Sequence, residues 1–280
     1  MNELVMQYEE VIRLSCFFGV LVLMAGWEIV APRRPLSVSK TVRWLNNLGI
    51  VFLNSFLLRW LFPIAAVGLA VLAKQEQWGV LNNFDLPVWL GILVSVVLLD
   101  SVIYLQHVMF HALPLLWRLH RMHHADVDFD VTTGSRFHPI EIILSLLIKL
   151  AAIMVLGPPA VAVLLFEVIL NMMAMFNHSN IALPDKIDRV LRWLVVTPDM
   201  HRVHHSVLSC ETNSNFGFNL SLWDRLFGTY RAQPAAGHQA MQIGLDQFRE
   251  PKYLTLPWLL VLPFLGQVTG YVINRSQDER

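Results

Sequence analysis

Long apolar stretches constrain the fold of this chain more than any other feature of its sequence. Three of them lie in the first 110 residues, at 14–31, 50–73 and 86–110. Because about 20 mostly apolar residues in a helix cross the hydrocarbon core of a bilayer, each stretch is long enough to span a membrane. Only 15% of the residues are charged, against roughly 25% in an ordinary soluble domain. The sequence therefore predicts an all-α integral membrane protein.

A fourth apolar region, residues 140–176, is divided by Gly157, Pro158 and Pro159, which together are a strong turn signal. We expect a helical hairpin here, and about four transmembrane helices or hairpin legs in all. Lys149 and Glu167 lie at nearly equal distances from the turn, so antiparallel legs would place them face to face. Since an isolated charge at that depth is energetically unfavourable, we predict that these two residues form an ion pair.

Basic residues predict how the chain is oriented, because they concentrate in cytoplasmic loops. Clusters of Lys and Arg follow the first run, the third run and the hairpin, whereas residues 74–85 contain one Lys and the Gly-Pro-Pro turn contains none. We therefore expect the basic connections on the cytoplasmic side and the connections poor in basic residues on the other side.

The last apolar run, residues 253–273, is interrupted by Pro and Gly, and we expect it to be interfacial or re-entrant. Arg59 lies within an apolar run, and either an ion pair with Asp100 or a lipid headgroup would satisfy it.

The expected organisation is one integrated domain with three regions. These are N-terminal transmembrane helices at 1–94, a histidine-bearing catalytic region at 95–231 and a C-terminal interfacial or re-entrant segment at 232–280.

Composition excludes two classes of function. Lys and Arg together (21) equal Asp and Glu together (21), so the chain has no net positive charge to attract a nucleic-acid partner. Two cysteines exclude an iron–sulfur cluster held by four thiolates of this chain.

Histidines are concentrated in the middle of the chain, where ten of the eleven lie between residues 107 and 205. Eight form three clusters: His107 and His111; His120, His123 and His124; and His201, His204 and His205. Residues three and four apart share a helix face, so we expect each cluster to project its imidazoles in one direction. Imidazole suits Zn, Fe, Cu and Ni, and this number of ligands exceeds the capacity of one ion. The clusters therefore predict a site for two metal ions, in a helical cap on the cytoplasmic side.

Further residues are candidates for the same site. His138 and His178 flank the hairpin at its two cytoplasmic ends, and we expect them to be ligands or close neighbours of ligands. Asp100 and Tyr104 share a helical stripe with His107. Both are candidates to accept the second N–H of a metal-bound imidazole, although Asp100 would equally well bind a neighbouring helix. Three alternating residues, Asp126, Asp128 and Asp130, are more typical of a solvated turn than of a hard-cation site.

Together these motifs resemble the fatty acid hydroxylase / sterol desaturase superfamily, which consists of membrane di-iron oxygenases. The resemblance rests on the three histidine clusters, on Asp100 and Tyr104 upstream of His107, on Phe137-His138-Pro139 and Asn177-His178-Ser179-Asn180, and on residues 215–220 and 223–230. It covers about residues 95–231. It implies a site for two iron ions, which zinc could replace in a purified sample. It also implies O₂ as co-substrate and electrons from an external donor protein or a diffusible reductant.

The function that the resemblance implies is hydroxylation of an unactivated C–H bond of a lipid, such as a fatty acyl chain or a sterol. A desaturase would use the same site and remove two hydrogens instead. An alternative of another class is a non-redox zinc-binding membrane protein, and metal analysis combined with absorption spectroscopy separates it from the oxygenases. The expected location is a bacterial cytoplasmic membrane or, alternatively, the endoplasmic reticulum, with the site on the cytoplasmic face in both cases.

Replacing His123 or His204 by Ala tests the ligand assignment. We expect either substitution to abolish lipid oxidation while the chain still folds and inserts into membranes, because each removes one ligand nitrogen from the site. The measurement is product formation per molecule of membrane-inserted protein. Full activity in either variant would contradict the assignment.

Overall fold

The computed structural model describes residues 2–62, 66–267 and 270–273 of the chain. Within these ranges the secondary structure is entirely helical, apart from three isolated β-bridges, which confirms the predicted all-α class. The longer helices are α1 (Asn2–Val30), α2 (Lys40–Leu61), α3 (Ala66–Gln75), α4 (Val88–Ala112), α5 (Pro114–His124), α6 (Pro139–Leu156) and α7 (Ala160–Asn177). The shorter ones are η1 (Val80–Asn83), η2 (Thr133–Ser135), α8 (Asp185–Leu191), α9 (Pro198–His204), α10 (Ser209–Thr212), α11 (Leu222–Leu226), α12 (Gly237–Ala240), η3 (Pro251–Leu254), α13 (Leu256–Val261) and η4 (Leu262–Phe264).

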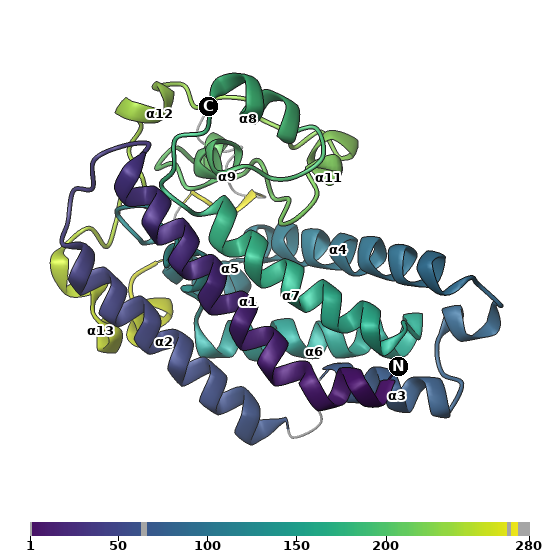
Figure 1. Ribbon diagram of the computed structural model, residues 1–280. Coiled ribbons are helices and arrows are strands. Elements are labelled where there is room, and N and C mark those ends of the chain that lie inside the picture. The colour runs from purple at the N-terminus through teal and green to yellow at the C-terminus, as the bar shows by residue number, and fades with distance from the viewer. Residues whose placement is uncertain (1, 63–65, 268–269, 274–280) are drawn as a thin grey trace.

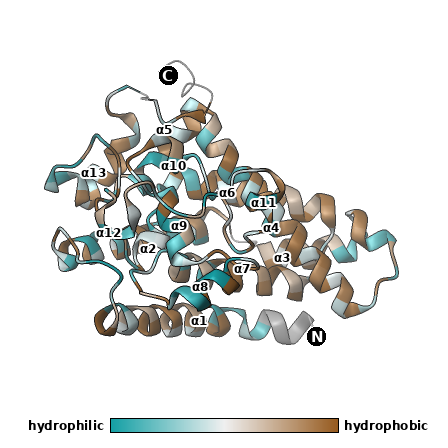
Figure 2. Cartoon of the chain, turned by 90° about the horizontal axis from the view of Figure 1, so that it is seen from above, coloured by the Kyte–Doolittle hydropathy of each residue, from teal (hydrophilic) through white to brown (hydrophobic). Residues whose placement is uncertain are grey.

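Five segments are long and apolar enough to cross a membrane, one more than the approximate number that the sequence predicts, and the second of them includes residues 63–65, which lie outside the described ranges. They are Gln7–Val30, Lys40–Asn83, Val88–Ala112, Pro139–Leu156 and Ala160–Asn177. Hydrophobic residues dominate α3 and α4, whereas hydrophilic residues gather around α8, α9 and α10 (Figure 2). In Figure 1 the short helices α8, α9, α11 and α12 lie together above α4 and α7. The long helices thus carry a separate cap of short ones.

The apolar run at 50–73 is not a single helix. Helix α2 ends at Leu61, where the Phe62 N–H still donates to the Leu58 carbonyl, and α3 begins at Ala66. Phe62 precedes a proline and leaves the helical region, with φ −126° and ψ 77°, as the ring of a following proline requires. The break therefore separates the long helix α2 from the ten-residue helix α3.

The predicted hairpin is confirmed. Helices α6 and α7 are joined at Gly157, which adopts the left-handed conformation with φ 65° and ψ 47°. Lys149 and Glu167 form the predicted ion pair between the two legs. Arg13 of α1 also pairs with Glu167, so one carboxylate joins three helices at a depth where an unpaired charge is unfavourable. Arg59 pairs with Glu10 of α1, and not with Asp100.

The connections are sorted between two ends of the helices, as the basic residues predict. At one end, Gly79 packs so closely on the hairpin turn that a Cβ built on it would lie 2.2 Å from the Gly157 nitrogen. At the other end, the Ala182 N–H donates to the Ala31 carbonyl (2.9 Å) and the Arg33 N–H to the Asn180 carbonyl (2.8 Å). The two connections that are poor in basic residues therefore share one end, and the basic ones share the opposite end.

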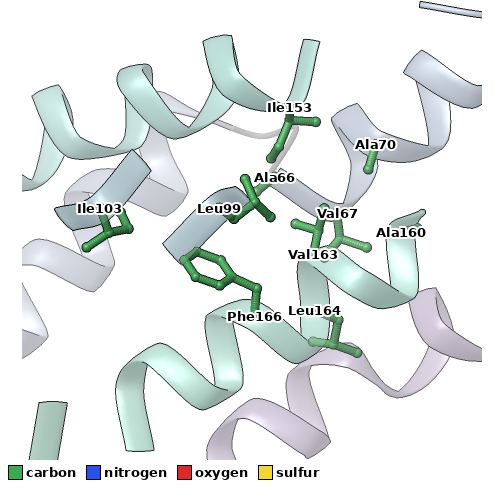
Figure 3. Packing of buried hydrophobic residues seen from close by; sticks show 10 residues of the cluster. All are labelled: Ala66, Val67, Ala70, Leu99, Ile103, Ile153, Ala160, Val163, Leu164 and Phe166. Atoms are coloured by element: carbon green, nitrogen blue, oxygen red, sulfur yellow. The ribbon is translucent and has the colours of Figure 1, made fainter. Parts of the chain in front are cut away.

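Small side chains allow the membrane helices to pack closely, as is common where lipid and protein are equally apolar. Ala66, Val67 and Ala70 of α3 pack with Leu99 of α4 and with residues of the hairpin (Figure 3). The hairpin contributes Ile153, Ala160, Val163, Leu164 and Phe166. This apolar cluster anchors the ends of the helices that lie away from the basic connections.

A buried ionic cluster ties α2 to the connection between α5 and α6, and it corrects the expectation that the three aspartates are solvated. Arg43 donates to both oxygens of Asp126 (2.8 Å each) and to Asp130 (2.5 Å), and all three residues are fully buried. Burial alone would raise the pKa of Asp126, but the Arg43 and Arg136 guanidinium groups lower it to about 2. Asp128 accepts hydrogen bonds from the backbone N–H groups of Ser37 and Val38. These carboxylates therefore fix a connection instead of facing solvent.

The C-terminal apolar run does not form a membrane-spanning helix in its described part. Helix α13 has six residues and η4 has three, far fewer than a bilayer requires. Arg121 of α5 donates to the carbonyls of Leu262 (2.9 Å) and Pro263 (3.3 Å). The Tyr271 hydroxyl donates to the Val207 carbonyl (2.7 Å). The described part of the run therefore folds back against α5, and an interfacial or re-entrant position for it stays a prediction.

Replacing Gly157 by Ala tests the hairpin turn. The residue has a positive φ, and a Cβ would lie 2.4 Å from the Trp78 carbonyl oxygen. We expect the free energy of unfolding to fall by about 1–3 kcal/mol, measured as a lower thermal midpoint in detergent. Gly91→Ala is the matched control. Gly91 lies inside α4, and a Cβ there would make an ordinary 3.7 Å contact with the Pro159 side chain. Equal midpoints for the two variants would contradict the account of the turn.

Candidate metal centre

Nine buried histidines converge into two adjacent groups. Within each group, one ligand nitrogen of every member lies within 4.8 Å of the others. The first group is His107, His111, His120, His124 and His204, and the second is His123, His178, His201 and His205. Each ring is at most 5% exposed. The structure thus brings together all eight clustered histidines and His178.

Local sequence explains how these side chains reach one place. His107 and His111 lie one turn apart at the end of α4, where the chain turns at Leu113 before Pro114 starts α5. Proline suits the first turn of a helix, where its missing N–H is not needed. Thr197 caps α9, and its hydroxyl accepts from the Met200 N–H (3.4 Å). Two short helices therefore present their histidines to the end of α4.

Each HxxHH cluster is divided between the two groups, which corrects the expectation that a cluster points in one direction. Helix α5 supplies His120 and His124 to the first group and His123 to the second. The second HxxHH, which begins in α9, supplies His204 to the first group and both His201 and His205 to the second. Consecutive helical residues are separated by about 100°, so neighbouring histidines cannot converge on one point. The spacing therefore suits two ions held side by side.

Hydrogen bonds fix the tautomers in the first group. The Nδ1–H of His107 donates to the Phe216 carbonyl (2.8 Å), that of His204 to the Ser214 carbonyl (2.8 Å) and that of His120 to Glu141 (2.6 Å). A carbonyl or carboxylate oxygen only accepts, so Nε2 carries no proton in these neutral rings. Nevertheless, Nε2 of His107 lies 3.1 Å from Nε2 of both His120 and His204. Three lone pairs thus face one another without a proton between them.

In the second group, two of the four rings are held in the same way. The Nδ1–H of His123 donates to the Arg136 carbonyl (3.2 Å), and that of His178 to the Ala174 carbonyl (2.8 Å). Their Nε2 atoms lie 3.1 Å apart, and Nε2 of His201 is 3.1 Å from that of His178. Two nitrogens bound at right angles to one ion, at about 2.1 Å each, would be about 3.0 Å apart. The observed spacing therefore fits a cation in each group.

The remaining rings complete the two groups. Nδ1 of His111 donates to the Asn213 side-chain oxygen (3.2 Å), which leaves its Nε2 without a hydrogen-bond partner among the described residues. The rings of His124 and His205 stack at 4.5 Å between centroids, and neither ring nitrogen of either residue has a partner there. These two rings connect the groups. Buried polar atoms without partners are unusual, and a bound cation would satisfy the unprotonated nitrogen of each ring.

Burial keeps these imidazoles in the form that binds metal. It lowers the pKa of His120 and of His178 to about 3. Burial, reinforced by neighbouring imidazoles, places the pKa of His123, His204 and His205 well below its usual value. A histidine binds a metal ion through a neutral ring. The donor set is therefore ready at neutral pH.

His138 lies outside both groups, which corrects its assignment as a candidate ligand. Its Nδ1 accepts from the Ile140 N–H (3.2 Å), as the cap of α6, and its Nε2 donates to the Leu260 carbonyl (3.2 Å). Both ring nitrogens are therefore engaged in holding the start of α6 against the C-terminal segment. His138 is a helix cap because Pro139 begins the helix directly after it.

Asp100 and Tyr104 support the site from further away than predicted. Asp100 accepts hydrogen bonds from the Leu220 N–H (3.2 Å) and the Trp223 indole (2.8 Å). The Tyr104 hydroxyl bonds to Thr229 (2.9 Å). Neither residue has a hydrogen bond to a histidine in the described structure. They hold the segment that follows the last histidines against α4, which is the alternative that the sequence left open for Asp100.

Glu141 is the residue of this site that sequence reasoning missed. Its carboxylate is 4% exposed and accepts from His120, and its second oxygen has no partner among the described atoms. A carboxylate bonded to a ligand imidazole fixes the ring and raises its basicity. The sequence did contain a signal for Glu141. It lies two residues after Pro139, in the first turn of the helix that follows His138.

Asp224 is a second residue that the sequence did not single out. It accepts hydrogen bonds from the N–H groups of Phe216 (2.7 Å) and Gly217 (2.8 Å) and from the Thr229 hydroxyl (2.6 Å). Burial raises the pKa of Asp224 to about 6, although these hydrogen bonds oppose the shift. Asp224 thereby holds the loop whose Phe216 carbonyl orients His107.

A small cavity of about 30 Å³ lies beside the first group. It is lined by Ile103, Gln106, His107, Phe110, His120, Phe137, Glu141 and Phe218. Four of these residues belong to α4, and Glu141 belongs to α6. The cavity is thus placed between two candidate membrane spans and directly against the His107–His120 pair.

Residues 92–229 match the fatty acid hydroxylase family model, and this range contains every histidine of both groups. This part of the chain belongs to the fatty acid hydroxylase family. The resemblance that the histidine motifs indicated is therefore confirmed for this domain. Together with the five apolar segments, membership of this family of membrane enzymes identifies the chain as an integral membrane protein.

Curated relatives of this fatty acid hydroxylase domain act on lipids. The chain is 29% identical over 180 residues to the ornithine lipid hydroxylase OlsE of Rhizobium tropici, covering 62% of this chain and 51% of the relative. It is 27% identical over 192 residues to the alkylglycerol monooxygenase of Xenopus tropicalis, covering 66% and 41%. It is 24% identical over 146 residues to the cholesterol 25-hydroxylase of Rattus norvegicus, covering 51% and 47%. The matches span about half or less of each relative, and no solved structure matches the chain.

Replacing Glu141 by Leu tests its contact with His120. We expect the affinity for ferrous iron or zinc to fall about 10–100-fold, because the His120 ring loses its acceptor. Glu141→Gln keeps an acceptor oxygen and should lose less. The measurement is competition with a chromophoric chelator in detergent, with the exposed Glu250→Leu as control. Unchanged affinity in Glu141→Leu would show that the contact has no role in holding metal.

Proposed function

We propose that this chain hydroxylates an unactivated C–H bond of a membrane lipid, using O₂ and externally supplied electrons. The observation that carries the proposal is the set of unprotonated imidazole nitrogens that face one another in two adjacent groups. Such an arrangement is unfavourable without cations, and nitrogen ligands suit iron. Membership of the fatty acid hydroxylase family supports iron as the metal and a lipid as the substrate, because iron is typical of this family and its members oxidise lipids.

The proposed ligands are the nine histidines of the two groups. Each group would hold one ion. Bound iron would supply the O₂ and one-electron chemistry that amino-acid side chains lack. Glu141 and the carbonyls of Phe216, Ser214 and Arg136 keep the rings of His120, His107, His204 and His123 turned inward. The protein thereby provides a rigid, neutral and buried donor set.

The cavity beside His107 and His120 is the proposed position of the reacting carbon. Phe110, Phe137 and Phe218 give it an apolar wall. Its other walls come from α4 and α6, so an acyl or sterol chain would reach it from the bilayer without crossing water. This route is supported by the lipid names of the relatives, which include an ornithine lipid hydroxylase and an alkylglycerol monooxygenase.

The proposed setting is a bacterial cytoplasmic membrane with the site on the cytoplasmic face. It is supported by the basic residues of the connections at the metal end, because such residues favour the cytoplasm. Reducing equivalents would come from a separate donor protein or a diffusible reductant.

Isotope incorporation tests the proposed reaction. The iron-loaded chain in nanodiscs of bacterial phospholipid and ornithine lipid, supplied with NADPH, ferredoxin, its reductase and ¹⁸O₂, should yield lipid that has gained one ¹⁸O atom, while the other oxygen atom leaves as water. His123→Ala in equal amount is the control and should yield none. Mass spectrometry of extracted lipids is the measurement. Loss of two hydrogens without label would instead indicate a desaturase, and bound zinc with no O₂ consumption after anaerobic iron loading would indicate the non-redox alternative.

A further inference from the structure

Exposed apolar side chains cover a surface at the metal end of the molecule, outside the five candidate spans. On and just after α8, Val190 is 68% exposed and Leu194 is 70% exposed. On α11, Leu226 is 65% exposed. Ile187, Trp193, Leu222 and Phe227 are also exposed. We call residues 186–194 together with 222–227 the α8–α11 surface.

The two parts of this surface are joined. The Ser221 N–H donates to the Leu194 carbonyl (3.2 Å), and Val195 forms a β-bridge with Leu220. The Arg225 guanidinium lies between the rings of Trp193 (4.1 Å) and Tyr230 (4.0 Å). Both parts lie above α4 and α7 in the view of Figure 1. The exposed apolar side chains therefore come from two segments that are bonded to each other on the same part of the molecule.

The α8 segment buries charged side chains and leaves apolar ones exposed. Its buried side is polar, since Asp188 and Arg192 are 7% and 5% exposed and pair with each other. Asp188 also accepts from the Thr197 hydroxyl (2.5 Å), beside the start of α9. A surface helix in water turns its apolar side inward. Here Ile187 and Val190 face outward instead, beside the exposed Lys186 and Arg189, which is the mixture of apolar and basic side chains found on helices that lie at a membrane interface.

The α8–α11 surface continues onto a membrane-spanning helix. Phe227 is 55% exposed and stacks on Tyr104 of α4, with ring centroids 5.4 Å apart and planes 16° apart. The next residue of α4, Leu105, is 53% exposed. Because α4 is a candidate span, this stacking joins the α8–α11 surface to a helix that is long and apolar enough to cross the bilayer. This continuity selects the bilayer, and not a soluble protein, as the occupant.

Charged residues at the edge of the surface fit the same occupant. Lys186 and Arg189 are exposed on α8, as is Asp185 at its start. Long basic side chains beside an apolar area can reach lipid phosphates while their stems stay in the apolar layer. Trp193, next to these residues, is a type of side chain enriched at membrane interfaces.

We infer that the α8–α11 surface is embedded in the boundary between headgroups and acyl chains of a phospholipid bilayer. It would hold the cap against the membrane, so that the histidine groups stay at the level of the lipids. The inference concerns the position of the cap and does not depend on which reaction the metal centre carries out.

Spin-label accessibility tests this inference. In a chain carrying Cys16→Ser and Cys210→Ser, single substitutions Val190→Cys, Leu194→Cys and Leu226→Cys are labelled with a nitroxide and reconstituted into phosphatidylcholine–phosphatidylglycerol vesicles. Collision rates with O₂, which concentrates in lipid, are compared with those of water-soluble chromium oxalate. Phe52→Cys, exposed on α2, is the lipid-facing reference, and Gln233→Cys, exposed in the segment that precedes α12, is the aqueous reference.

We expect all three labels to match Phe52→Cys, with a higher ratio of O₂ to chromium oxalate collisions than Gln233→Cys. Labels that match Gln233→Cys would overturn the inference. Spin–spin broadening that disappears when labelled chains are diluted with unlabelled ones would also overturn it, because a second copy would then cover the surface. Elution of each labelled chain as a single species confirms that these exposed substitutions leave the fold intact. No activity measurement enters the test, so its failure is distinct from failure of the proposed function.

Discussion

The unprotonated imidazole nitrogens that face one another at 3.1 Å are the constraint on which the rest of this structure depends. Neutral rings in that arrangement repel each other, so acceptors at Nδ1 must hold them from behind, as they do for His107, His120 and His178. The acceptors come from separate parts of the chain: the loop at 213–216, the start of α6 and the end of α7. The positions of the histidines therefore depend on the contacts that hold these segments together.

Buried polar contacts supply that positioning where the long helices meet the cap. Helices in lipid gain little from apolar contact alone, so polar pairs and close packing must hold them together. Arg43 binds the α5–α6 connection to α2, and Glu28 at the end of α1 accepts from the Val131 and Asn180 N–H groups. Asp100 and Asp224 hold the loop that carries the Phe216 carbonyl. If the α8–α11 surface lies in the bilayer, lipid covers the outer side of the same assembly.

Sequence periodicity succeeded where a property depends on one helix or on two antiparallel neighbours. The hairpin at Gly157 and the pairing of Lys149 with Glu167 followed from counting residues from a turn. Periodicity failed where the partner comes from elsewhere in the chain. Asp100 shares a stripe with His107, but the groups that approach it are Leu220 and Trp223. His138 lies near the other histidines in sequence, yet it caps α6.

The sequence by itself determined the all-α membrane architecture, the end of the molecule at which the histidines gather and the presence of more imidazoles than one ion needs. These follow from local hydrophobicity, charge and residue type, which do not depend on distant contacts. Only the tertiary structure decided that each HxxHH cluster divides between two groups, that Glu141 supports His120 and that α8 exposes Ile187 and Val190 while it buries Asp188. Those features depend on which side chains a fold brings opposite one another, and residues far apart in the chain supply them.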